Sequence, residues 1–253
     1  MRLANIIDDV RTVITFFTVI PIGGSHDLSK AFRSAGISII IIPPITGLIP
    51  GLVGFYMWIL THNNLLSASL AYALLLVLTG LNHIDGYSDV IDALMVRGSI
   101  EDRIKVLKDP HRGSAAIVMV VMLVIIAVSA LTSLANSMWL SLFIAEIISK
   151  SSCCLCAFIG REPPYRGLGW LLTRQVRENR YLTITALIIG LLITYALSRL
   201  IGIVVFIVSI AFSIFLFMLI QRSLGGAVGD LYGFTLEVSR VLALVLFAIL
   251  LKL

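Results

Sequence analysis

Residues 115–134 read AAIVMVVMLVIIAVSALTSL, twenty consecutive residues without a charged side chain. A helix of this length is about 30 Å long, which matches the hydrocarbon core of a bilayer. The stretch is continuously apolar and does not alternate, which favours a helix over a strand of a membrane barrel. Six further apolar stretches cover approximately residues 37–61, 65–81, 138–159, 182–200, 202–220 and 238–253. Two of the seven stretches, 65–81 and 238–253, are short for a span. The sequence therefore predicts an all-α polytopic membrane bundle with about six to seven transmembrane helices.

The overall composition supports the same fold class. Hydrophobic residues make up 59% of the chain and charged residues 13%, against about 25% charged residues in soluble proteins. We therefore expect one membrane-embedded domain over residues 1–253, with the lipid bilayer as its solvent. The net charge of +5 does not indicate a nucleic-acid partner, because the basic residues are scattered between apolar stretches and form no long tract.

Basic residues collect in alternate connections. They occupy the segments 1–36, 82–114, 160–181 and 221–237. The other connections are the short ones at 61–64, 135–137 and 199–201, which carry only Arg199. The positive-inside rule then places the N-terminus and the four basic segments in the cytoplasm of a multi-pass cell-membrane protein. Nearly all acidic residues fall in the same segments, so we expect the active site to face the cytoplasm.

Three local features complete this outline. The chain starts with an amphipathic pattern typical of an interfacial helix and not of a cleaved signal peptide; its apolar face holds Ile6, Ile7, Val10, Val13, Ile14 and Phe17. The first span carries Pro43, Pro44 and Pro50, which predicts a kinked or broken helix. The three cysteines, Cys153, Cys154 and Cys156, have no second group of metal ligands nearby and are interpreted as small helix residues.

The strongest polar motif is HIDGYSDVID, residues 83–92. Its three aspartates, Asp85, Asp89 and Asp92, fall within about 60° of arc on one helix face. Three like charges this close need a compensating cation, and carboxylates that leave positions for water and phosphate oxygens suit Mg²⁺. The alternative is a solvated polar face on a loop helix.

Two further motifs follow this helix. Residues 98–103, GSIEDR, resemble the capping box that starts a helix, and that helix carries Arg103, Lys105 and Lys108. These basic side chains suit a polyanionic ligand beside a metal, although ordinary positive-inside charge would also account for them. Residues 225–237, GGAVGDLYGFTLE, place glycines before a helix, where backbone N–H groups can approach a phosphate; Gly229 and Gly233 could instead serve close helix packing.

Ionisable residues also occur near or inside the later spans. Asp230 and Glu237 are seven residues apart and predict a second acidic face. Glu146 and Lys150 lie one helical turn apart inside the fourth span, where charged residues are functional candidates or simply pair with each other.

Taken together, these motifs resemble the cobalamin synthase family, adenosylcobinamide-GDP ribazoletransferase. The first motif keeps the family's register at His83, Asp85, Gly86, Asp89, Asp92, Asp109 and Gly113. The late motif matches at Gly225, Gly226, Gly229, Asp230, Gly233 and Glu237, and an early element matches at Pro44, Gly47 and Gly51. The resemblance covers roughly residues 15–240. Departures from the pattern are Ser88, Ala93, Val228, the tetrapeptide TVIP at 18–21, and Lys150 in place of an arginine.

The resemblance implies an enzyme that transfers the cobinamide phosphate of adenosylcobinamide-GDP to α-ribazole or α-ribazole 5′-phosphate. The products are adenosylcobalamin or its 5′-phosphate and GMP, in the last steps of cobalamin nucleotide-loop assembly. On this interpretation Mg²⁺ is held by Asp85, Asp89, Asp92 and Asp109, and His83 and Asp230 are the catalytic candidates. The expected substrate-binding residues are Arg103, Lys108, Gly225, Gly226, Gly229 and Glu237.

Two other functions remain open from the residues alone. Asn82, Asp85 and Asp89 loosely resemble the first motif of membrane-bound Mg²⁺-dependent prenyltransferases, but the spacing is one residue short and a second such motif is absent from the sequence. A cation transporter would need acidic groups at mid-membrane depth and usually an internal repeat, whereas these aspartates follow the end of an apolar stretch. The sequence does not determine an oligomeric state.

Overall fold

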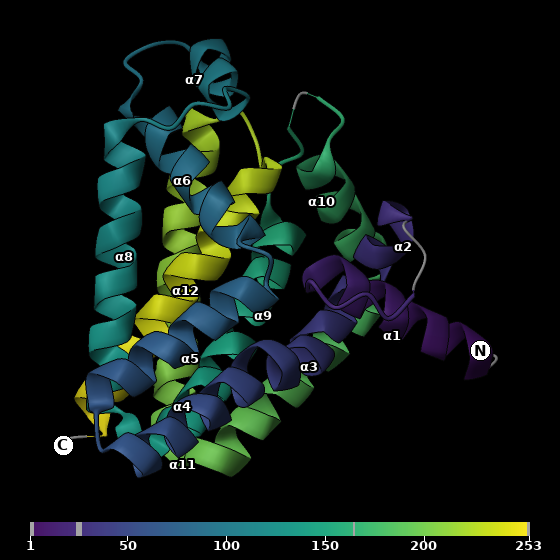
Figure 1. Cartoon of the computed structure of the whole chain (residues 1–253). Helices are drawn as coiled ribbons and strands as arrows, with labels where there is room; N and C mark the ends of the chain where they lie inside the picture. Colours follow the sequence, from purple (N-terminus) through teal and green to yellow (C-terminus); the bar gives the residue numbers. More distant parts are fainter. Residues whose placement is uncertain (1–2, 24–26, 164, 252–253) are drawn as a thin grey trace.

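The computed structural model describes residues 3–23, 27–163 and 165–251, and within them every regular element is helical (Figure 1). Side chains are described from residue 7 onward, so the predicted contribution of Ile6 and the last two residues of the 238–253 stretch lie outside the described part. Five helices of this part are long and apolar enough to cross a membrane, or six if one bent pair is a single span. The prediction of an all-α polytopic membrane bundle is confirmed.

The first span is irregular where the prolines fall. After a short 3₁₀ turn, η1 (Ala35–Ile37), the chain forms α3 (Ser38–Pro43), a π-helical turn, η2 (Pro44–Leu48), and α4 (Ile49–Thr61). Proline cannot donate a backbone hydrogen bond and its ring crowds the preceding turn, and a wider π-turn relieves both effects. The prolines thus coincide with an irregular π-turn, although Ala35–Thr61 remains one span of 27 residues and is not broken.

The helix that carries the three aspartates is turned sharply against its predecessor. It is α6 (Asn82–Met95), and it meets α5 (Asn64–Leu78) at 89°. The turn between them uses left-handed backbone at Gly80 and Leu81, with φ of +66° and +61°. The predicted helix for the three aspartates is thus present, and it folds back and packs into the bundle against α12 and α8.

Helices α7 and α8 follow this turn. Helix α7 (Ile100–Leu107) begins with the predicted capping box, because Ser99 and Asp102 each bind the other's backbone N–H. Helix α8 (Ser114–Ser133) is the stretch of residues 115–134 and returns across the molecule to a 3₁₀ turn, η3 (Ala135–Ser137). Figure 1 shows α7 at the top and the connection between α4 and α5 at the bottom.

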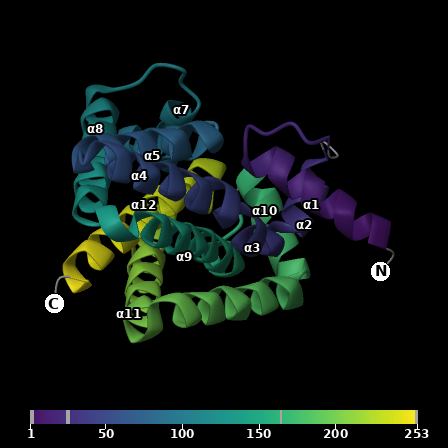
Figure 2. The ribbon, with the colours of Figure 1, turned by 60° about the horizontal axis from the view of Figure 1, so that its bottom comes forward.

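The last three long helices form the centre and one flank of the bundle. Helix α9 (Met138–Ile159) is buried over most of its length, and α12 (Gly229–Leu250) packs directly against it. Helix α11 (Arg180–Ser223) has a non-helical break at Arg199, so its 44 residues form two arms, which Figure 2 shows at a wide angle to each other. These arms correspond to the two stretches predicted at 182–200 and 202–220.

Three amphipathic helices lie beside the bundle. They are α1 (Leu3–Phe17), α2 (Leu28–Arg33) and α10 (Leu168–Glu178). The predicted N-terminal amphipathic helix is therefore present. Helix α10 packs against α2, α9 and α12, and α1 packs against α2 and α3, so together they cover one side of the helix ends that hold the polar motifs.

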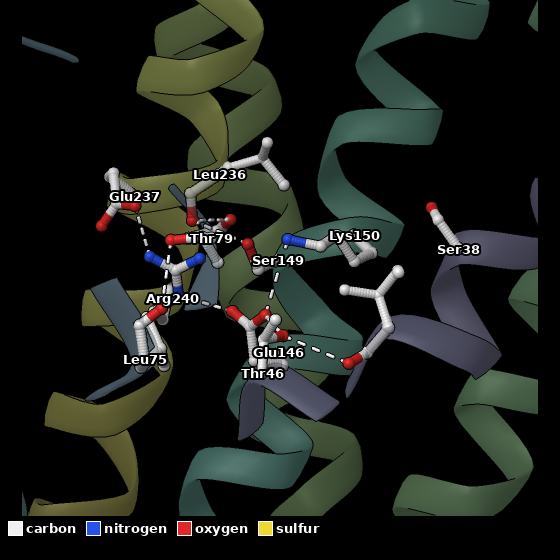
Figure 3. A network of polar contacts seen from close by, with 12 residues as sticks. Ser38, Thr46, Leu75, Thr79, Glu146, Ser149, Lys150, Leu236, Glu237 and Arg240 are labelled. Carbon is white, nitrogen blue, oxygen red and sulfur yellow. Dashed lines mark hydrogen bonds and ion pairs between the residues drawn. The ribbon is translucent and has the colours of Figure 1, made fainter. Parts of the chain in front are cut away.

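Charged side chains meet in the interior between α9 and α12. The Arg240 guanidinium contacts Glu237 on its own helix and lies 2.5 Å from a carboxylate oxygen of Glu146. The Lys150 ammonium is 3.5 Å from the other oxygen of Glu146, and these four side chains are all at most 1% exposed (Figure 3). The predicted pair of Glu146 and Lys150 thus exists, as part of a larger network whose formal charges sum to zero.

Candidate active site

A cavity of about 390 Å³ lies where α6 and α12 begin. Most of its polar lining comes from these two helices: Asn82, His83 and Asp85 from α6, and Gly229, Asp230 and Tyr232 from α12, with Thr79 and Cys153 from elsewhere. Its apolar lining comes mainly from the three amphipathic helices: Phe16 and Phe17 of α1, Phe32 of α2, and Leu168 and Leu172 of α10. The cavity therefore has one wall of carboxylates and one wall of aromatic and aliphatic side chains.

Two glycines allow α6 and α12 to touch. A Cβ on Gly86 would lie 2.9 Å from the carbonyl oxygen of Asp230, and one on Gly233 would lie 3.0 Å from the carbonyl oxygen of His83. Real Cβ atoms essentially never come as close to another atom as the first distance, and the second is tighter than nine in ten real contacts. Glycine is therefore required at Gly86 and strongly favoured at Gly233. The contact brings Asp85 and Asp230, each in the first turn of its helix, onto one cavity, where the positive end of the helix dipole favours negative charge.

Asp85 and Asp89 share one cation. Both carboxylates contact the guanidinium of Arg112, which lies between α7 and α8. Partial burial lowers the pKa of Arg112, but the hydrogen bond to Asp85 and the charge of Asp89 outweigh burial and raise the pKa above its ordinary value. The two aspartates thus turn their oxygens to a common position next to the cavity, as their spacing in the sequence predicts.

Asp92 has a different role. Its carboxylate accepts hydrogen bonds from the backbone N–H groups of Gly113, at 2.6 Å, and Ala116, at 3.1 Å, and so caps the start of α8. A Cβ on Gly113 would lie 2.5 Å from a carboxylate oxygen of Asp92, so a larger residue here would push this carboxylate away from the start of α8. The third aspartate of the face therefore joins α6 to α8.

Asp109 lies apart from the other three aspartates. It is exposed and bonds to the backbone and ring of His111 at 2.9 and 2.8 Å, and the backbone bond lowers the pKa of its carboxyl group. Among the residues that the structure describes, no three His, Cys, Asp or Glu side chains are already arranged as a metal-ligand group. The metal assignment for the four aspartates stays a prediction, which the geometry supports best for Asp85 and Asp89.

The predicted phosphate-binding residues lie mostly on the connections around the cavity and not in its lining. Arg103 donates to the carbonyl oxygens of Val96 and Ser223 at 3.3 and 3.1 Å, and Lys108 lies 4.9 Å from the ring centre of Tyr165. These contacts tie α7 to the segments before α10 and α12.

The glycine-rich segment has a similar division of roles. Gly225 and Gly226 adopt positive φ values of 73° and 158°, and a Cβ on Gly226 would lie 2.5 Å from the Cα of Pro163. Both therefore serve the turn before α12. Gly229 is the member of this segment that lines the cavity.

Glu237 lies two turns along α12 from Asp230 and is fully buried. It contacts Arg240 and accepts a hydrogen bond of 3.3 Å from the Tyr72 hydroxyl. The second acidic face predicted from the sequence is thus divided: Asp230 lies on the cavity, and Glu237 belongs to the interior network.

Arg112 was recognised in the sequence only as positive-inside charge. It directly precedes Gly113, which Asp92 caps, and this position brings its guanidinium onto Asp85 and Asp89.

The donor chemistry at this site fits a divalent cation. The carboxylates of Asp85 and Asp89 already converge on one cationic group, and oxygen ligands are those that Mg²⁺ prefers. The cavity with Asp85 and Asp230 adjoins this position, so a phosphate held there could complete the coordination.

The fold and the cavity define a class: a multi-pass helical membrane protein with carboxylates gathered at two helix N-termini. The chain belongs to the cobalamin-5-phosphate synthase family, whose model matches residues 9–248. It is 35% identical over 236 residues to an adenosylcobinamide-GDP ribazoletransferase of Pyrobaculum islandicum, covering 93% of this chain and 92% of the relative. The protein of the same name from Methanocella arvoryzae is 27% identical, with 95% of each chain covered. No solved structure matches this chain.

The cap formed by Asp92 leads to a stability prediction. Asp92→Ala should lower the stability of the protein by about 1 kcal/mol, because the first N–H groups of α8 lose their acceptor. Thermal unfolding in detergent, without added metal, measures the loss, and hydrogen exchange should show it concentrated at the start of α8. Asp109→Ala removes an exposed carboxylate and is the control, with little expected change. Equal effects of the two substitutions would show that the cap contributes nothing.

Proposed function

We propose that this protein is an adenosylcobinamide-GDP ribazoletransferase, which joins the cobinamide phosphate of adenosylcobinamide-GDP to α-ribazole or its 5′-phosphate and releases GMP. The observation that carries the proposal is the carboxylate-lined cavity at the crossing of α6 and α12, in a chain that matches the family along nearly its whole length. Family membership also disfavours the prenyltransferase and cation-transporter alternatives.

The proposal includes Mg²⁺ as the cofactor. Asp85 and Asp89 would hold it, since their oxygens share one position, and bound Mg²⁺ would neutralise charge on the diphosphate of the donor. Arg112 contacts both carboxylates and is the side chain that would shift toward a phosphate when these carboxylates bind a metal. Asp92 and Asp109 would contribute indirectly, through the positions of α8 and of the loop before it.

The transfer itself is a substitution at phosphorus. The 3′-hydroxyl of the ribazole attacks the phosphorus attached to cobinamide, the bond to the oxygen of GMP breaks, and the hydroxyl proton passes to a base. His83 and Asp230 both line the cavity and are the two candidates. The Nδ1 atom of His83 is buried without a hydrogen-bond partner in the described structure, so this atom would need a change of side-chain position to reach a substrate hydroxyl.

The activity is testable with purified protein in detergent. GMP should be released from adenosylcobinamide-GDP only when α-ribazole or its phosphate is present, and a chelator should abolish the release. Asp85→Ala and Asp89→Ala should each lose most of the turnover, because each removes a ligand of the metal ion that would neutralise phosphate charge. Glu101→Ala, at an exposed carboxylate of α7, is the matched control. Near-normal rates for both aspartate variants would show that the acidic helix face is only a solvated surface without a role in catalysis.

A pH–rate profile distinguishes the two candidate bases. The variant that lacks the base, His83→Ala or Asp230→Asn, should lose kcat strongly and also lose the acidic limb of the profile, because no group then needs to deprotonate. Binding of adenosylcobinamide-GDP should persist in that variant. If both variants keep the wild-type limb, neither side chain accepts the proton.

The proposal further places the protein in the cell membrane with the cavity toward the cytoplasm, on the strength of the basic-residue asymmetry. Cysteines introduced singly at Asn64 and Ser137 should react with an impermeant reagent applied to sealed cells, and one at Ser99 should not. The three native cysteines are buried, so their background labelling should be low. Labelling at Ser99 from outside would invert the topology.

A further inference from the structure

The apolar wall of the cavity is an aromatic cluster with a defined geometry. The ring of Phe16 packs edge to face against Phe17 and against Phe32, with ring centres 5.0 Å apart in both pairs and interplanar angles of 84° and 81°. Leu168 and Leu172 of α10 complete the wall. Phe32 is 4% exposed, whereas Phe16 and Phe17 are half-buried.

We propose that this aromatic wall, made by Phe16, Phe17, Phe32, Leu168 and Leu172, binds the base of the acceptor nucleoside and so selects the acceptor. The inference rests on the proposed function and adds to it the place of one substrate. The acceptor, α-ribazole, has a flat dimethylbenzimidazole base at one end and a polar ribose at the other. The lining has the same division, because α1, α2 and α10 supply the aromatic wall while α6 and α12 supply His83, Asp85 and Asp230.

Size separates the acceptor from the donor. A cavity of about 390 Å³ is at the lower end of the range that encloses one small organic molecule. A nucleoside of the size of α-ribazole fits this volume. A corrinoid that carries guanosine diphosphate is several times larger, so it cannot enter as a whole and its corrin ring stays outside.

Polarity separates the acceptor base from the guanine of the donor. Guanine has a dense edge of hydrogen-bond donors and acceptors, which phenylalanine and leucine cannot satisfy, and each buried unsatisfied group costs about 1–3 kcal/mol. Dimethylbenzimidazole in a nucleoside keeps one ring nitrogen as an acceptor, and the remainder of its surface is apolar or aromatic. The rings of Phe16, Phe17 and Phe32, packed edge to face with centres 5.0 Å apart, are suitable partners for such a base.

Orientation follows from the two walls. With the base against α1, α2 and α10, the ribose points to the start of α6 and α12, where the attack on phosphorus is proposed. The elements of the aromatic wall are separate from the helices that carry the carboxylates. Substitutions in the wall should therefore change acceptor binding without disturbing the groups that act on the phosphate.

Kinetics with both substrates varied tests the proposal. Phe16→Ala and Phe17→Ala should each raise KM for α-ribazole about tenfold, while KM for adenosylcobinamide-GDP and kcat at saturating acceptor stay within about twofold of wild type. Free dimethylbenzimidazole should inhibit competitively against α-ribazole and not against the donor, and more weakly in both variants. Phe215→Ala, at an exposed position of the second arm of α11, is the matched control and should change neither KM.

Three outcomes would overturn the proposal: an unchanged KM for α-ribazole in both variants, a raised KM for the donor alone, or inhibition by dimethylbenzimidazole that competes with the donor. The half-buried Phe16 and Phe17 are chosen because their loss should leave the bundle folded; if either variant fails to fold, Phe16→Leu or Phe17→Leu keeps the bulk and removes the ring. Calorimetric measurement of α-ribazole binding to wild type and variants in detergent tests the acceptor subsite independently of the transferase activity. Wild-type protein that binds α-ribazole through this wall but releases no GMP would contradict the proposed function and support the subsite.

Discussion

The other contacts of the site depend on the buried ion pairs that the arginine of α12 makes with two glutamates. Arg240 is fully enclosed and reaches Glu146 on α9 and Glu237 on its own helix (Figure 3). In a bilayer an unpaired charge at this depth is costly, and removing one partner of a buried pair typically costs about 3–5 kcal/mol. Because Glu146 also accepts a hydrogen bond from Thr46 and Glu237 accepts one from Tyr72, the network ties α12 to α9, to the π-turn η2 and to α5. These contacts determine the rotation of α12 about its own axis and its position along α9.

Further contacts position the part of α12 between this network and the cavity. The Leu236 carbonyl oxygen, one turn before Arg240, accepts a hydrogen bond of 2.8 Å from the Ser149 hydroxyl, and Leu236 itself lines the cavity. The next contact is Gly233 against α6, which has no room for adjustment because backbone meets backbone. Asp230 then reaches the cavity that Asp85 enters from α6. A charge-balanced network between α9 and α12 thus helps to position Asp230 beside Asp85 on the cavity.

Much of the site was predictable from local pattern, and the missing parts share one physical cause. The spacing of Asp85, Asp89 and Asp92 correctly predicted one helix face, since 3.6 residues per turn is a property of the helix alone. The different role of Asp92 was not predictable, because its partners at the start of α8 are more than 20 residues away and depend on how α6 packs against α8. The same holds for Arg112, which resembles ordinary positive-inside charge until that packing places it on two carboxylates.

The sequence by itself determined the embedding of the protein in a membrane, the positions of its long apolar helices, the proline-induced irregularity in the first span and the family to which its polar motifs belong. These are consequences of composition, length and short-range periodicity, which act within a few turns of chain. The sequence did not predict α2 and α10, which lie in the basic connections. Only the tertiary structure decided that α6 turns back at Gly80 and Leu81 into the bundle, and that Glu237 joins a buried network while Asp230 lines a cavity. It also decided that Phe16, Phe17 and Phe32 line the same cavity as Asp85 and Asp230. Each of these depends on contacts between segments far apart in the chain, where close glycine packing and the neutralisation of buried charge select one arrangement among many that the local pattern allows.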